Sequence, residues 1–223
     1  MNPRVSHQKT AALTMMEIFV VIVVLFVLAA LLLYTRSHRP DTNLRQEVRQ
    51  INCINDLKLI AVAFRVWEGN HGDKYPMQIS VTNGGTMELA NGRNAWINFS
   101  AMSNELSIPK VLICPADTDK IAATNFTTDF DNSKISYFIN LDADNTNPQM
   151  FLSGDDNFAI GGVPVKSGLL QFSPSIPISW TTARHHFSGE IVLTDGSVNP
   201  SSNNTLTNLI QQTAIATNRL AIP

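Results

Sequence analysis

The longest apolar segment of the chain lies near its N-terminus, where residues 18–34 read IFVVIVVLFVLAALLLY without a charged side chain. As an α-helix this run is about 26 Å long, and starting it at Ala11 lengthens it to about 36 Å. A hydrocarbon core is ~30 Å thick, and in lipid a helix satisfies all its backbone hydrogen bonds within one segment. The pattern therefore predicts one membrane-spanning helix, despite its many β-branched residues.

A cleaved secretory signal is the alternative interpretation of this segment. Signal peptides have apolar regions of about 7–15 residues followed by a small-residue cleavage site. This run is longer, and it continues into the letters YTR at residues 34–36. Arg4 and Lys9 precede the segment while Arg36 and Arg39 follow it, so the basic residues leave its orientation open.

One acidic side chain, Glu17, lies inside the apolar block, between Met16 and Ile18. At full depth in a bilayer an acidic side chain costs about 2–3 kcal/mol, and less near the interface. The carboxylate either marks the membrane boundary among the head groups or requires a cationic partner. Chemistry alone leaves both interpretations open.

A second helical pattern follows Pro40, which ends or kinks the first helix. Apolar residues recur at helical spacing and alternate with charged ones, as in an amphipathic helix. The apolar positions are Leu44, Val48, Ile51, Leu57, Ile60, Phe64 and Trp67. The letters GNHG at residues 69–72 provide turn chemistry, so we expect an amphipathic helix over residues 36–68.

Residues 69–223 predict a globular α+β head with a small antiparallel sheet. Short apolar runs separated by Gly, Asn, Asp, Ser and Pro are typical of such strands. The strand candidates are residues 111–114, 135–139, 150–152 and 191–193. Asp195-Gly196 predicts a hairpin turn after the last of these, because glycine tolerates positive φ. Residues 205–220 predict a closing helix.

Composition narrows the functional classes. The chain has 16 Lys and Arg against 18 Asp and Glu, which argues against a nucleic-acid partner because such proteins need a basic face. With 44% hydrophobic and 15% charged residues it is not a disordered charged tail. Two cysteines exclude a disulfide-dense scaffold and a four-cysteine zinc site.

The letters ALTMME at residues 12–17, after a basic leader of residues 1–12, resemble the prepilin signature of type IV pilins and type II secretion pseudopilins. The resemblance implies that prepilin peptidase cleaves between Ala12 and Leu13, and that the new N-terminus at Leu13 is methylated. It also implies that Glu17 pairs with the N-terminal amine of a neighbouring subunit during assembly. Such pairing relieves the desolvation cost of both charges.

Further segments are similar to pseudopilin-like proteins of the planctomycete–verrucomicrobial group. They are CINDLK at 53–58, GDKYP at 72–76, LICPAD at 112–117, ISYF at 135–138, LSGDDN at 152–157, and an H-x9-DG element formed by His185, Asp195 and Gly196. The resemblance implies a pilin-like fold, in which a transmembrane and assembly helix of residues 13–35 continues into the amphipathic helix packed on the head.

The function implied by this resemblance is structural rather than enzymatic. The chain would be a single-pass protein of the bacterial inner membrane with its head in the periplasm. Its partners would be prepilin peptidase, the lipid bilayer, copies of itself, other pseudopilins and an inner-membrane assembly platform. The alternative is a membrane-anchored extracytoplasmic binding protein that does not polymerise.

Three sets of side chains beyond the apolar segment carry candidate chemistry. In an oxidising compartment Cys53 and Cys114 could form a disulfide that ties the helix to the sheet; the alternative is two buried, reduced cysteines. Asp and Asn residues supply the hard oxygen ligands that Ca²⁺ prefers. The candidate calcium ligands are Asp142, Asp144, Asp155 and Asp156.

The third set is His185 and Asp195, which could be drawn as a catalytic pair with Ser188 or Ser197 as nucleophile. No G-x-S-x-G nucleophile elbow accompanies them. We therefore expect a structural role, in which backbone groups satisfy His185 beside the turn at Asp195 and Gly196, and we expect no enzymatic activity.

Overall fold

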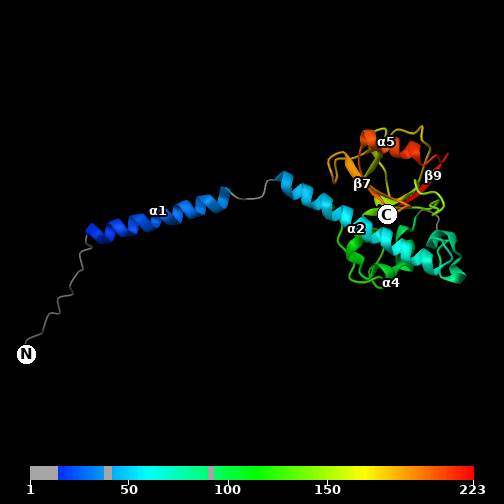
Figure 1. Cartoon of the computed structure of the whole chain (residues 1–223), viewed down its shortest axis with the longest axis horizontal. Helices are drawn as coiled ribbons and strands as arrows, with labels where there is room; N and C mark the ends of the chain where they lie inside the picture. The colour runs from blue at the N-terminus through cyan, green and yellow to red at the C-terminus, as the bar shows by residue number, and fades with distance from the viewer. Residues whose placement is uncertain (1–14, 38–41, 90–92) are drawn as a thin grey trace, which may run out of the picture. The chain divides into compact units, whose positions relative to one another are not determined.

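The computed structural model describes residues 15–37, 42–89 and 93–223 (Figure 1). The chain forms two compact units, Met1–Leu44 and Arg45–Pro223, and each is described by itself. The predicted cleavage site at Ala12 and Leu13 lies outside the described residues.

The first unit contains helix α1, Met15–Ser37. Its stretch Met15–Tyr34 is long and apolar enough to cross a membrane, and none of that stretch is buried against the rest of the protein. A core helix of the same composition would be mostly covered by other elements. The predicted apolar N-terminal helix is therefore confirmed, and its length and composition suit a membrane anchor or a signal sequence.

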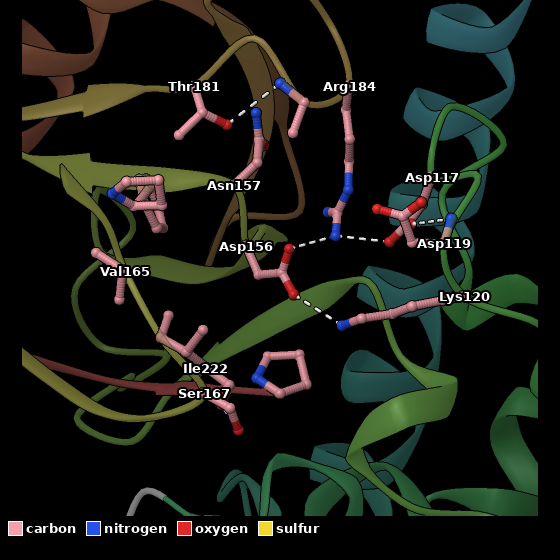
Figure 2. A pocket seen from close by; sticks show the side chains of 14 residues that line it. Asp117, Asp119, Lys120, Asp156, Asn157, Val165, Ser167, Thr181, Arg184 and Ile222 are labelled. Carbon is pink, nitrogen blue, oxygen red and sulfur yellow. Dashed lines mark hydrogen bonds and ion pairs between the residues drawn. The ribbon is translucent and has the colours of Figure 1, made fainter. Parts of the chain in front are cut away.

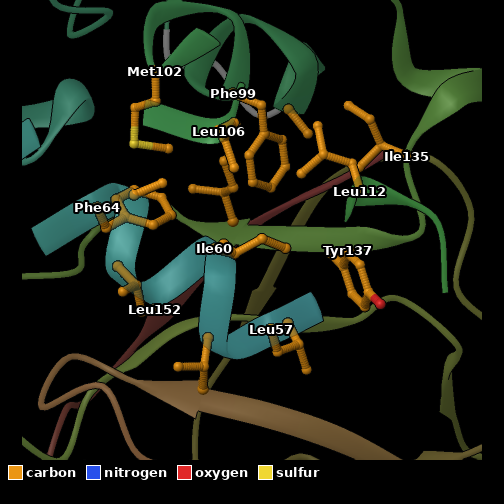
Figure 3. Packing of buried hydrophobic residues seen from close by; sticks show 14 of the residues in the cluster. Leu57, Ile60, Phe64, Phe99, Met102, Leu106, Leu112, Ile135, Tyr137 and Leu152 are labelled. Atoms are coloured by element: carbon orange, nitrogen blue, oxygen red, sulfur yellow. The ribbon is translucent and has the colours of Figure 1, made fainter. Parts of the chain in front are cut away.

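Helix α2, Thr42–Asn70, supplies one side of the core of the second unit (Figure 3). Its inward side chains Leu57, Ile60, Phe64 and Trp67 are buried. The helix ends at the predicted GNHG turn, where Gly72 has a positive φ of 66°. The amphipathic helix is therefore confirmed on its inner face, but not its predicted bounds of 36–68, since residues 36 and 37 belong to α1 and α2 extends to Asn70.

The main sheet of the head has six strands, all antiparallel to their neighbours, in the order β5-β9-β1-β2-β7-β8. The strands are β1 (Tyr137–Asn140), β2 (Phe151–Asp155), β5 (Gly168–Phe172), β7 (Ser188–Leu193), β8 (Val198–Ser202) and β9 (Asn218–Ile222). A smaller sheet has the order β4-β3-β6. Its strands are β3 (Phe158–Ile160), β4 (Val163–Pro164) and β6 (Ile178–Trp180).

The main sheet lies between two apolar clusters, and successive side chains of its strands pack alternately in one cluster and the other. Tyr137 and Ile139 of β1 pack in the cluster that contains the inner face of α2, whereas Phe138 between them packs in the second cluster. The second cluster includes side chains from the smaller sheet and from helix α5, Asn203–Gln212. This two-residue alternation is what a sheet covered on both faces requires, and the α+β class with an antiparallel sheet is confirmed.

The described residues between α2 and β1 form short helices, several of which contribute buried residues. They are η1 (Pro76–Gln78), η2 (Val81–Asn83), α3 (Ala95–Ala101), α4 (Ser103–Leu106), η3 (Pro109–Leu112) and η4 (Asn132–Lys134). Phe99 of α3, Leu106 of α4 and Leu112 of η3 are buried and meet the inner face of α2 in one cluster (Figure 3).

Two predicted elements are wrong. Residues 111–114 form no strand, because Pro109 opens the 3-10 turn η3 through Leu112; proline has a φ suited to the first position of a helix. The predicted helix over residues 205–220 ends early, as α5 at Gln212. Ala214 then adopts a φ of 54°, and the chain continues into β9, which pairs with both β1 and β5.

Gly154 lies at the centre of the main sheet, paired with Phe138 on one side and Ile191 on the other. A Cβ atom there would lie 2.6 Å from the carbonyl oxygen of Glu190 and 2.9 Å from the Phe138 ring. Because backbone cannot move aside cheaply, Gly154→Ala should lower the free energy of unfolding by ~2–3 kcal/mol in urea denaturation. Gly69→Ala is the control, since Gly69 lies in α2 with open space around its Cα. It should be neutral or stabilising by up to ~1 kcal/mol, and equal losses in both variants would contradict the packing described.

Candidate functional site

Four buried side chains with metal-binding or acid–base chemistry meet beneath the main sheet. They are Cys53, Cys114, Asp155 and His185, and their ligand atoms all lie within 4.8 Å of one another. The Cys114 Sγ is 3.2 Å from His185 Nε2, and that nitrogen is 3.6 Å from Asp155 Oδ2. The Cys53 Sγ is 3.6 Å from Asp155 Oδ1 and 3.7 Å from Oδ2. Across residues 15–37, 42–89 and 93–223, this is the one group of its kind.

Each member comes from a different part of the head. Cys53 lies on the inner face of α2, Cys114 follows η3, and Asp155 ends β2. His185 lies just before β7, where residues 186 and 187 adopt the left-handed φ values of 49° and 60°. Non-glycine residues rarely adopt this conformation, so the tertiary structure holds this turn next to the cluster.

Surrounding groups fix the orientation of the cluster. The backbone N–H of Glu190 donates a 2.9 Å hydrogen bond to Asp155 Oδ2, and the Tyr137 hydroxyl lies 3.3 Å from Cys53 Sγ. The Glu190 side chain is buried as well, and its Oε1 accepts a 2.7 Å bond from Gln50 Nε2 of α2. Burial raises the pKa of the Glu190 carboxyl to about 7; Asp155 adds to this, whereas the Gln50 bond and His185 oppose it.

The two thiols differ in acidity. Burial, together with the neighbouring Cys114 and the charge of Asp155, raises the pKa of Cys53. The pKa of Cys114 is lowered, chiefly by the Cys53 side chain and further by His185, against the effect of its own burial. Burial disfavours the charged form of His185, but the Cys114 sulfur and the Asp155 charge outweigh it and raise the His185 pKa.

A buried arginine, Arg184, neutralises the carboxylates next to the cluster (Figure 2). Its Nη2 lies 2.7 Å from Asp117 Oδ2 and also pairs with Asp156, and its Nη1 lies 3.6 Å from Asp155 Oδ1. Lys120 Nζ supplies a second cation, 3.0 Å from Asp156 Oδ2. These ion pairs form one wall of a pocket of about 260 Å³.

The pocket does not reach the cluster. Asp117, Lys120, Asp156 and Arg184 are among its lining residues, whereas no side chain of the Cys, Asp and His group is. The cationic side chains of the wall are already paired with the acidic ones. All four members of the cluster are themselves buried.

The predicted disulfide between Cys53 and Cys114 is not formed; both are free, buried cysteines. Their sulfur atoms belong to the same cluster, where each contacts a further polar group, Asp155 for Cys53 and His185 for Cys114. The two thiols were correctly placed together, but the prediction missed the carboxylate and imidazole between which they lie.

The four candidate calcium ligands do not gather into one site. Asp142 binds Arg219, with its Oδ1 2.8 Å from the guanidinium Nε, and Asp144 Oδ1 accepts a 2.8 Å bond from the backbone of Thr146. Asp156 pairs with Arg184 and Lys120. Of the four, only Asp155 belongs to the buried cluster with the two cysteines and the histidine. The carboxylates of Asp142, Asp144 and Asp156 are engaged in local turns and ion pairs instead.

The H-x9-DG element divides into two structural parts. The turn is as predicted: Asp195 Oδ1 accepts a 2.8 Å bond from Ser197 N, and Gly196 has a φ of 86° between β7 and β8. The expected backbone partners of the His185 ring are not found, because its Nε2 faces Cys114 and its buried Nδ1 has no hydrogen-bond partner among the described atoms. The Ser188 hydroxyl donates a hydrogen bond to the His185 backbone carbonyl.

The outward face of α2 carries an apolar stripe that the head does not cover. Val48, Ile51, Leu59, Val62 and Val66 are between 48% and 57% exposed. At 3.6 residues per turn they lie within a sector of about 80°, on the side opposite the buried face. Helix α2 therefore has two apolar faces, one in the core and one toward solvent. The sequence pattern predicted a single apolar face. Val48 and Ile51 were assigned to it together with the buried residues, but they belong to the outer face.

Asp56 lies beside a mostly apolar pocket of about 360 Å³, lined in part by Ile108 and Lys110. Burial raises the Asp56 pKa from 3.8 to about 6, while Lys110 acts in the opposite direction. Because the folded chain binds this proton more tightly than the unfolded chain, the group makes stability fall as pH rises from about 4 to about 6. Asp56→Asn should remove this fall and raise the free energy of unfolding at pH 7 by at most ~1 kcal/mol, since water screens a partly exposed group.

Urea denaturation between pH 4 and pH 7 checks the Asp56 prediction. Asp129→Asn is the control of opposite sign, because hydrogen bonds led by the Thr124 backbone N–H lower the Asp129 pKa. Asp129 stabilises the fold above its unfolded-state pKa and loses that effect as pH falls through the lowered value. A wild-type slope that persists in Asp56→Asn would show that another group causes it.

No protein-family model, curated protein or solved structure matches this chain. Its function is therefore argued from the residues and their arrangement.

Proposed function

We propose that this chain is a pilin-like structural subunit, anchored in a membrane by α1 and assembled into a filament or pseudopilus of a type II secretion or type IV pilus-like system. The single observation that carries the proposal is that two helices present apolar surfaces which the folded chain leaves uncovered. One is the whole circumference of α1 over Met15–Tyr34, and the other is the outer stripe of α2.

The α1 surface and the α2 stripe differ in the kind of partner that would cover them. The α1 surface suits lipid before assembly and neighbouring helices afterwards, since both are apolar. The α2 stripe is narrow and is bordered by charged residues such as Arg45, Glu47, Asp56, Lys58 and Arg65. A narrow apolar stripe flanked by charges is the pattern of a helix that packs against another helix in water. Helix packing along both segments is the architecture that the pilin resemblance implies.

The charged pocket of the head offers less support for the alternative of a ligand-capturing protein. Its guanidinium and ammonium groups are engaged by Asp117 and Asp156. A ligand would have to displace these buried ion pairs, which is costly.

Glu17 has a defined role in this proposal. It lies in the first turn of α1, directly before the uncharged apolar run of residues 18–34. After cleavage between Ala12 and Leu13, the new amine of one subunit would pair with the Glu17 carboxylate of the next and set the axial register. In low dielectric such a pair is favoured over two separated charges.

Glu17→Ala therefore should abolish incorporation into assemblies while leaving membrane insertion intact. The full-length chain is produced in a bacterium with a prepilin peptidase and an assembly machinery, and membrane and sheared-filament fractions are compared by immunoblot. Glu88→Ala, an exposed glutamate in the head outside both helices, is the control and should assemble as the wild type does. Normal assembly of Glu17→Ala would contradict the register role, and absence of wild-type assemblies would favour the anchored, non-polymerising alternative.

A further inference from the structure

The donor set of the buried cluster is chemically selective. It offers two sulfur atoms, one imidazole nitrogen and one carboxylate oxygen, from Cys53, Cys114, His185 and Asp155. Zinc takes sulfur, nitrogen and carboxylate ligands in fours, whereas Ca²⁺ and Mg²⁺ require oxygen ligands throughout. The set therefore matches a borderline-soft divalent cation.

The spacing of the donor atoms matches a tetrahedral ion as well. Bonds of ~2.0–2.3 Å place the corners of a zinc tetrahedron roughly 3.3–3.8 Å apart. The separations are 3.2 Å from Cys114 Sγ to His185 Nε2, 3.6 Å from that nitrogen to Asp155 Oδ2, and 3.7 Å from Cys53 Sγ to the same oxygen. These three separations are close to the edges of such a tetrahedron, and all four donor atoms, from four separate segments, lie within 4.8 Å of one another.

The surrounding groups suit a charged metal site. Two thiolates and one carboxylate carry three negative charges, which a divalent ion reduces to one, and Arg184 lies 3.6 Å from Asp155 to balance the remainder. The Tyr137 hydroxyl can donate to the Cys53 sulfur, and the Glu190 N–H holds the Asp155 oxygen. In metal sites, hydrogen bonds of this kind orient the side chains that bind the ion directly.

We propose that Cys53, Cys114, Asp155 and His185 bind one structural Zn²⁺ that ties α2, the segment after η3, β2 and the turn before β7 together. On binding, both thiols release their protons to solvent and the neutral imidazole coordinates through Nε2. All four ligands are buried, so no coordination position is left for a substrate and the ion has no catalytic role. The proposal does not depend on assembly and goes beyond the proposed function.

Metal content and thiol reactivity of the full-length chain test this proposal. The protein is purified in detergent from membranes without chelators, then analysed by elemental mass spectrometry and titrated with a thiol reagent before and after chelation. We expect about one zinc per chain and two thiols that react only after metal removal in denaturant. Replacement of zinc by Co²⁺ should give the visible absorption bands of a tetrahedral thiolate site.

Variants assign the ligands. Cys114→Ser and Asp155→Asn should lower the metal content by about tenfold or more, whereas Asp142→Asn, in the exposed pair with Arg219, should keep it. The wild-type measurement stands even if a ligand variant fails to fold. A disulfide between Cys53 and Cys114, or two free thiols without metal after incubation with Zn²⁺ and a reductant, would overturn the proposal.

Discussion

Arg184→Met is expected to lower the free energy of unfolding of the head by ~3–5 kcal/mol. The arginine side chain is only 7% exposed and is paired with Asp117, Asp155 and Asp156, whose side chains are at most 8% exposed. It also donates a 2.7 Å hydrogen bond to the carbonyl of Ser136. Methionine keeps most of the apolar stem but removes the charge, so three buried carboxylates lose their shared cation. A domain is typically stable by about 5–15 kcal/mol, so the loss would be a large share of the total.

The matched control is Arg219→Met in strand β9. The Arg219 side chain is 47% exposed, and its partner Asp142 is also accessible to water. An exposed ion pair contributes about 0–1 kcal/mol, so this variant should change stability by no more than that. Urea denaturation followed by circular dichroism measures both. Equal effects of the two substitutions would show that the buried charge network does not hold the head together.

Val62→Glu and Leu59→Glu are expected to abolish assembly without unfolding the head. Both side chains lie on the outer stripe of α2 and are more than half exposed. A glutamate there stays hydrated in the isolated subunit and changes its stability by less than ~0.5 kcal/mol, but a helix–helix contact would bury it without a partner. Sheared-filament yield and thermal unfolding are measured on the same preparations.

The control for the stripe lies one residue from Leu59. Ile60 is completely buried on the inner face of α2, so Ile60→Ala should cost about 2–5 kcal/mol of head stability. The two faces of one helix thus predict opposite phenotypes: lost assembly with a stable head on the outside, and a destabilised head on the inside. If both glutamate variants assembled normally, the outer stripe would have no role in packing.

Local patterns predicted the elements that depend on local chemistry. The length and apolarity of α1, the end of α2 at the GNHG turn, and the hairpin at Asp195 and Gly196 follow from side-chain periodicity and from the positive φ that glycine allows. The segment of β9 was misread as helix because its strand character comes from pairing with β1 and β5, which are distant in sequence. Pairing of that kind leaves no periodic signal.

The buried cluster could not be found from spacing for the same reason. Its members are separated by 30 to 61 residues along the chain and meet only after α2 has packed on the sheet. The two cysteines were predicted to lie together because they are the only thiols in the sequence. Asp155 was instead assigned to a calcium site with acidic residues that do not belong to the cluster. Arg184 was missed entirely, although an arginine next to the motif histidine in a chain with few charges was the available signal.

The N-terminus of the protein recovered from membranes of a bacterium that contains prepilin peptidase tests the assembly account most directly. Intact-mass and N-terminal peptide measurements on one sample identify the first residue and its modification. The account predicts a chain that begins at N-methylated Leu13. A protein that retains Met1 and its leader, and that sediments in detergent only as a monomer, would contradict it.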